Sequence, residues 1–105
     1  MVRIKAKIAN DFYSRLKGLL GTDEFPNDGA LFFPNVSSIH TFFMKYSIDV
    51  IFLDVNRKVI RLKENVKPYR IVFGGLKADS VLEMPCGSIK KMNINLGDLL
   101  SIEGY

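Results

Sequence analysis

The chain has 105 residues, of which 48% are hydrophobic and 25% charged, a composition typical of one globular domain and not of a disordered segment. Its apolar runs, such as residues 50–53, are far shorter than the roughly 18 to 20 residues that cross a bilayer, so no membrane span is expected. The net charge of +4 is concentrated in residues 1–20, with five basic and one acidic side chain, and in residues 57–70, with six and one.

The first element that the sequence predicts is a strand over residues 2–9. Apolar and basic residues alternate there, which places the apolar side chains on one face and Arg3, Lys5 and Lys7 on the other. The same segment lacks the continuous apolar core of a signal peptide, so we expect a cytoplasmic protein. Cys86 is the only cysteine, and an internal disulfide is therefore impossible.

A helix is expected next, over about residues 11–20. Asn10 and Asp11 are residues that accept hydrogen bonds from the free N–H groups of a helix start, and apolar residues then recur at helical spacing. Gly21 supplies a left-handed stop. The polar residues 21–29 follow as a loop.

The remainder of the chain predicts strands, over residues 30–33, 39–44, 49–55, 58–66, 71–73, 80–84 and 98–102. Residues 50–53 are apolar at every position, which is typical of a central strand covered on both faces. A hairpin turn is expected at 54–57, with Asn56 at positive φ, and a single helical turn at 88–92, with Ser88 as its cap. We therefore expect one mainly β (α+β) domain over residues 1–105. Its sheet would be small, antiparallel, barrel-like or strongly bent, with about seven strands and one covering N-terminal helix.

Several stretches together resemble a known family. They are residues 15–21 (Arg-Leu-Lys-Gly-Leu-Leu-Gly), 40–54, beginning His-Thr-Phe-Phe-Met-Lys, 68–70 (Pro-Tyr-Arg), 81–87 (Val-Leu-Glu-Met-Pro-Cys-Gly), and Gly97-Asp98. In this order they resemble the domain of unknown function 192 family, DUF192 or UPF0127, over nearly the whole chain. The resemblance implies a shared fold and names no activity. Tyr69 and Cys86 stand where family members commonly have tryptophan and alanine, which argues against Cys86 as a shared nucleophile.

Polar residues in apolar stretches are the candidates for a binding site: His40, Thr41, Met44, Asp49, Arg70 and Glu83. Our leading hypothesis is a non-enzymatic ligand-binding or accessory module with a pocket walled by His40, Met44, Asp49 and Arg70. Its partner would be an unidentified small molecule or protein. The structural interpretations stay open, since buried polar groups are usually paired. His40 would then be a hydrogen-bonded core residue, Asp49 would hold a bend, and Glu83 would pair with Arg70.

Two other functions stay open. A small hydrolase or sugar-processing enzyme would use Asp49, Glu83 and His40 around one cleft. An anion- or nucleic-acid-binding protein would use the basic strands, with Arg3, Lys5 and Lys7 assisted by Lys58, Arg61 and Lys63. No cofactor is expected, and no metal, because one histidine and one cysteine do not supply the usual ligands of a structural zinc site.

Overall fold

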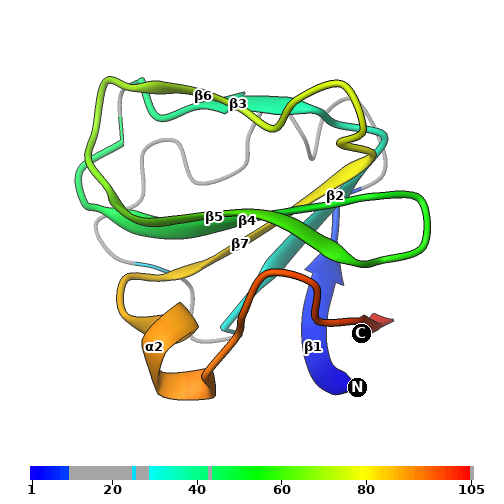
Figure 1. Cartoon of the computed structure of the whole chain (residues 1–105). Coiled ribbons are helices and arrows are strands. Elements are labelled where there is room, and N and C mark those ends of the chain that lie inside the picture. The colour runs from blue at the N-terminus through cyan, green and yellow to red at the C-terminus, as the bar shows by residue number, and fades with distance from the viewer. Residues whose placement is uncertain (10–24, 26–28, 43, 105) are drawn as a thin grey trace.

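The computed structural model describes residues 1–9, 25, 29–42 and 44–104, and within them the chain forms eight strands and one short helix (Figure 1). In chain order these are β1 (Val2–Ile8), β2 (Leu31–Pro34), β3 (Ser38–His40), β4 (Ile48–Leu53), β5 (Val59–Val66), β6 (Ile71–Phe73), β7 (Ser80–Pro85), α2 (Ser88–Met92) and β8 (Leu100–Gly104). The prediction of a mainly β protein is confirmed. The helix expected over residues 11–20 lies outside the described residues.

Six of the strands form a mixed sheet in the order β5-β4-β7-β2-β1-β8, and β3 pairs with β6 as a separate two-stranded ribbon. β1 runs parallel to both β2 and β8, whereas the other pairs are antiparallel. The expectation of a wholly antiparallel sheet is therefore wrong. Tight hairpins impose antiparallel pairing, but long connections separate β1 from both of its neighbours and leave their direction free.

The sheet is not closed into a barrel, because β5 and β8 stand at opposite ends of the strand order. The two ends approach each other at one corner, where Lys58 and Leu99 form an isolated bridge and the Val59 N–H donates to the Asp98 carbonyl at 2.8 Å. In Figure 1 the β3–β6 ribbon lies over one side of β4 and β5, and α2 lies beyond the other side. β4 and β5 thus lie between the ribbon and α2.

β4 is the centre of the core, and all six of its residues are buried. Ile51 and Leu53 belong to the hydrophobic cluster that includes Ile89 of α2. Val50 and Phe52 belong to the cluster on the opposite face, which includes Val72 of the ribbon. The prediction of a central strand covered on both faces is confirmed.

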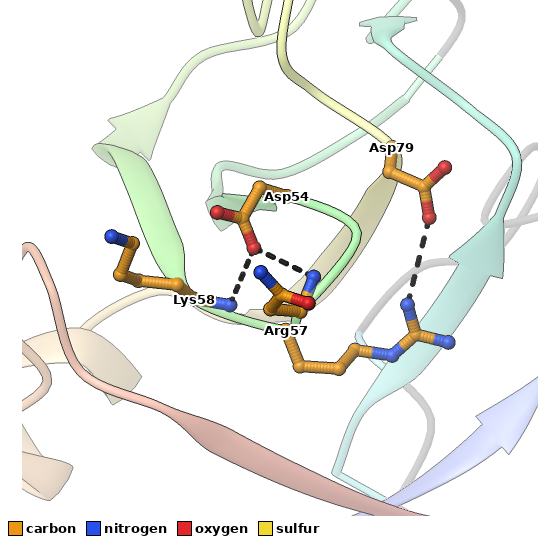
Figure 2. A network of polar contacts seen from close by, with 5 residues as sticks. Asp54, Arg57, Lys58 and Asp79 are labelled. Atoms are coloured by element: carbon orange, nitrogen blue, oxygen red, sulfur yellow. Dashed lines mark hydrogen bonds and ion pairs between the residues drawn. The ribbon is translucent and has the colours of Figure 1, made fainter.

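The turn between β4 and β5 is held by Asp54, whose Oδ1 accepts hydrogen bonds from the N–H groups of Asn56 at 2.9 Å and Lys58 at 3.0 Å (Figure 2). The Lys58 N–H is the largest cause that lowers the pKa of the Asp54 carboxyl below its usual value. Positive φ falls on Arg57, at 64°, and not on Asn56 as expected. The Arg57 guanidinium reaches Asp79 at 3.6 Å and lies 4.8 Å from the centroid of the Phe32 ring.

Two other local predictions need correction. The strand expected over residues 39–44 ends at His40, because the Met44 N–H donates to the Thr41 carbonyl at 3.2 Å and turns the chain. The helical turn at 88–92 is confirmed as α2, but its N-cap is Gly87, at φ 95°, and it has no side-chain cap from its own segment. Ser88 instead donates its hydroxyl proton to the Pro85 carbonyl at 2.6 Å.

Candidate functional site

An exposed apolar surface covers the outer side of the β3–β6 ribbon. The strand register pairs Ser38 with Phe73 and His40 with Ile71, so these side chains share one face. Ile39 and Val72 take the opposite face and pack against the core. Tyr69, Ile71 and Phe73 are 58%, 56% and 65% exposed. We call His40, Phe42, Tyr69, Ile71 and Phe73 the ribbon face.

Three rings at one end of the ribbon face lie close together. His40 and Phe42 are stacked, with ring centroids 5.3 Å apart and planes at 26°. Phe42 and Tyr69 are 6.1 Å apart and tilted by 42°. His40 is exposed, and its Nδ1 accepts the Phe42 N–H at 3.3 Å. The lone histidine is therefore a surface residue and not the buried core residue that its apolar neighbours indicated.

Thr41 fixes the loop that carries Tyr69 and Arg70. Its hydroxyl donates to the Lys67 carbonyl at 2.7 Å and accepts the Arg70 N–H at 2.9 Å. Its backbone N–H donates to the Arg70 carbonyl at 2.8 Å, and its carbonyl accepts the Tyr69 N–H at 2.9 Å. Tyr69 has φ 63°, a left-handed conformation that costs an ordinary residue energy. Thr41 is fully buried and holds the backbone in that conformation.

The two chain segments that contain the ribbon strands are basic. Segments 29–48 and 65–78, which contain both ribbon strands, include no aspartate or glutamate, and they carry Lys45, Lys67, Arg70 and Lys77. Arg70 is exposed, and its guanidinium donates to the carbonyls of Pro68 at 3.3 Å and Tyr69 at 3.4 Å. These bonds hold a positive charge at the backbone of residues 68–69.

Asp49 lies on the other side of the sheet and is completely buried. Its Oδ1 accepts the Asn65 N–H at 3.0 Å, and its Oδ2 accepts the N–H groups of Gly87 at 3.1 Å and Ile89 at 2.9 Å. The carboxylate therefore supplies from β4 the cap that α2 lacks in its own segment. This geometry agrees with the structural interpretation, in which Asp49 accepts backbone N–H bonds.

Glu83 projects from β7 toward the ribbon side, since it stands opposite Val50 and Leu31 in the register, and both belong to the cluster on that side. The side chain is 7% exposed, and burial raises its pKa to about 7. No ion pair joins it to Arg70 among the described residues, because Arg70 lies at the exposed end of the ribbon. The pairing that the sequence indicated is therefore wrong.

The structure does not bring the predicted pocket residues together. Thr41 and Arg70 are hydrogen-bonded and His40 is adjacent, whereas Met44 is buried in the core cluster, and Asp49 and Glu83 project from opposite faces of the sheet. Cys86 is exposed, and its thiol donates to the Asn65 side-chain oxygen at 3.4 Å. In the described part of the chain, no group of His, Cys, Asp and Glu side chains is arranged to hold a metal ion, and no helix is long and apolar enough to span a membrane.

Two cavities lie elsewhere on the described surface. One, of about 520 Å³, has Met1, Phe32, Arg57 and Leu100 among its lining residues. The other, of about 290 Å³, lies between β1 and α2 and includes Arg3, Lys5 and Lys91. Neither contains a residue of the predicted pocket, but the second includes Arg3 and Lys5 of the predicted anion-binding strand face.

Sequence reasoning missed Phe42, Ile71 and Phe73 as surface residues. The available signal was the alternation at positions 71 and 73, which places two large side chains on one face of a short strand. That signal shows a shared face but not which face is covered.

Comparison with known proteins shows which family this chain belongs to. The DUF192 model, described as "Uncharacterized ACR", matches residues 1–102. A UPF0127 protein of Thermococcus sibiricus is 37% identical over 103 residues, which cover 94% of this chain and 66% of the relative. A UPF0127 protein of Pyrococcus furiosus is 32% identical, with 94% and 87% covered. The chain spans about two thirds of the T. sibiricus relative and 64% of the one from Thermococcus kodakarensis.

Solved structures share the fold. A protein of unknown function from Novosphingobium aromaticivorans has a TM-score of 0.78 at 22% identity, covering 90% of this chain and 71% of its own. A putative transcription regulator from Sinorhizobium meliloti has a TM-score of 0.79 at 20% identity, covering 90% and 78%. The sequence resemblance is thus confirmed, and the chain belongs to the uncharacterised DUF192 family, whose relatives bear the name UPF0127.

Proposed function

We propose that this protein is a non-enzymatic binding module and that the ribbon face is its recognition surface. The observation that carries the proposal is that Tyr69, Ile71 and Phe73 are each more than half exposed. Ile71 and Phe73 share one side of the hydrogen-bonded ribbon, and the Tyr69 ring adjoins that side through its contact with the Phe42 ring. Adjoining large apolar side chains on a soluble surface are a common mark of an interaction site. Aromatic residues in such a surface supply contact area at low entropic cost.

The predicted site residues take different roles in this proposal. His40 and Arg70 contribute polar groups at the ribbon face, and Thr41 is the positioning residue that sets the loop beside it. Met44, Asp49 and Glu83 are buried and do not belong to the ribbon face. We also propose a cytoplasmic location, since an exposed free thiol at Cys86 suits a reducing compartment.

The geometry does not favour the hydrolase. Asp49 stands opposite Met84 in the β4–β7 register and Glu83 opposite Val50, so the two carboxyl groups project from opposite faces. All three hydrogen bonds of the Asp49 carboxylate go to backbone N–H groups, and His40 lies outside on the ribbon. A shared acid–base cleft would need these groups on one side.

Titration with anilinonaphthalene sulfonate, a fluorescent ring-bearing anion, tests the proposal. We expect Phe73→Ser to weaken binding of the dye by about tenfold, which is the order of a lost aromatic contact. Leu96→Ser is the matched control, because Leu96 is also 65% exposed but lies between α2 and β8, away from the ribbon. Equal binding by the Phe73 variant and the unmodified protein would contradict the proposal.

A further inference from the structure

We propose that the ribbon face binds single-stranded nucleic acid by stacking bases on its rings. This inference rests on the proposed function and adds the class of ligand. It differs from binding through the basic strand face of Arg3, Lys5 and Lys7, because here the recognition elements are aromatic rings, with Arg70 on the same loop as Tyr69.

The arrangement of the rings supports stacking. Residues two apart on a strand lie about 7 Å apart, so the paired rows Ser38–Phe73 and His40–Ile71 form steps along the ribbon. The neighbouring rings of Phe42 and Tyr69 form a third row just beyond the strand ends. Each of these rows contains at least one ring. Proteins that bind single strands present aromatic side chains on an open sheet in this way, because every base offers a π-face whatever its sequence.

The charge distribution supports a polyanion. The ribbon segments 29–48 and 65–78 carry four lysines and arginines and no carboxylate, although the whole chain contains 11 acidic residues. Arg70 is hydrogen-bonded to the Pro68 and Tyr69 carbonyls, which keeps its charge at the backbone of the loop that carries Tyr69. A phosphate bound at Arg70 and Lys67 would leave its base next to Tyr69 and Phe42.

An anionic membrane is the competing occupant, because exposed aromatic and basic residues also favour lipid interfaces. The arrangement of the rings favours nucleic-acid bases over a lipid surface. His40 and Phe42 are already stacked on each other across the surface, and His40 is a polar ring in the middle of the row. A membrane anchor inserts an apolar face and gains nothing from a histidine at its centre.

The test is fluorescence anisotropy with a labelled oligothymidylate of about 12 nucleotides, a length within the usual site size of such proteins. We expect the oligonucleotide to bind with a salt-dependent association constant. The logarithm of that constant should fall with the logarithm of salt concentration, with a slope of about 0.7 for each basic side chain that contacts a phosphate. Tyr69→Ala and Phe73→Ala should each weaken binding roughly tenfold, because each removes one stacking partner. Tyr69→Phe should bind like the unmodified protein, and Leu96→Ala, the matched control, should have no effect.

Three results would overturn the inference. They are absence of binding at low salt, equal affinity for a duplex of the same length, and binding to phosphatidylcholine–phosphatidylserine vesicles without binding to the oligonucleotide. The dye titration distinguishes failure of the recognition surface from failure of the nucleic-acid ligand. If Phe73→Ser weakens dye binding while the oligonucleotide does not bind, the recognition surface stands and the nucleic-acid ligand is wrong. If both fail, the surface itself is wrong.

Discussion

Thr41 and Arg70 hold each other through reciprocal hydrogen bonds, since the Thr41 N–H donates to the Arg70 carbonyl at 2.8 Å and the Arg70 N–H donates to the Thr41 hydroxyl at 2.9 Å. This pair lies directly after His40 and directly before Ile71, at the end of the β3–β6 ribbon. It joins the buried interior to the exposed ribbon face. The conformation of that face therefore depends on one buried hydroxyl group.

Replacing this hydroxyl group tests its role. Thr41→Val should lower the free energy of unfolding by about 2 kcal/mol, because it leaves the Lys67 carbonyl and the Arg70 N–H without their partner. Thr41→Ser keeps the hydroxyl and should retain most of the stability. Urea unfolding measures both. A larger loss in the Ser variant than in the Val variant, which keeps the methyl group, would show that packing of the methyl group, and not hydrogen bonding, is what matters.

Asp49 should contribute to the stability of the fold. Asp49→Ala removes the acceptor for three N–H groups and should cost roughly 3 kcal/mol, and Asp49→Asn, which keeps one acceptor oxygen, should cost about half as much. Amide hydrogen exchange should speed up at Gly87 and Ile89 in both variants. Unchanged stability together with lost dye binding would instead make Asp49 a site residue.

Glu83 should make stability depend on pH. Its pKa in the folded protein, about 7, is above the ordinary value of 4.5, so between these values the folded state binds more protons than the unfolded state. Stability should therefore be greatest below about pH 4.5 and fall by about 3 kcal/mol as the pH rises to 7, as far as this residue contributes.

Glu83→Gln isolates that effect. The variant cannot ionise, so its stability relative to the unmodified protein should rise steadily from pH 4.5 to 7 and stay constant above. Urea unfolding across this range gives the difference. A difference that does not change with pH would mean that the folded protein does not raise the pKa of Glu83.

Gly74 couples the ribbon to the core. A Cβ atom there would collide with the Phe52 ring and lie 2.6 Å from the Ala78 Cβ. Gly74→Ala should therefore cost about 3 kcal/mol, since the ring is fully buried and cannot move freely. Gly75→Ala is the comparison: no atom lies within 4 Å, but φ is 98°, and only the backbone strain of about 1 kcal/mol is expected. Thermal unfolding of both variants gives the ranking, and a larger loss at Gly75 would contradict it.

Much of the strand pattern was predictable because its signals are local. The alternation in β1 and the continuous apolar run of β4 both follow directly from side-chain period and burial. The strand predicted over residues 39–44 was too long, because the apolar run from Phe42 to Met44 is typical of a strand. A backbone hydrogen bond from the Met44 N–H to the Thr41 carbonyl instead bends the chain.

The site was harder to predict because its determinants are distant in sequence. Asp49 caps α2 from 40 residues away, and Thr41 reaches Arg70 over 29. Neither pairing has a local signal. The exposure of Tyr69 and Phe73 depends on which side of the ribbon meets the sheet, and apolar residues occupy both sides. Only the three-dimensional arrangement separates the recognition surface from the core.

The most direct test of the ribbon face is a map of amide chemical shifts during titration with anilinonaphthalene sulfonate. The proposed function predicts that the largest changes fall on residues 38–42 and 69–73 and that Phe73→Ser reduces them. Largest changes at the residues lining the cavity with Arg3 and Lys91, or the one with Phe32 and Leu100, would contradict it.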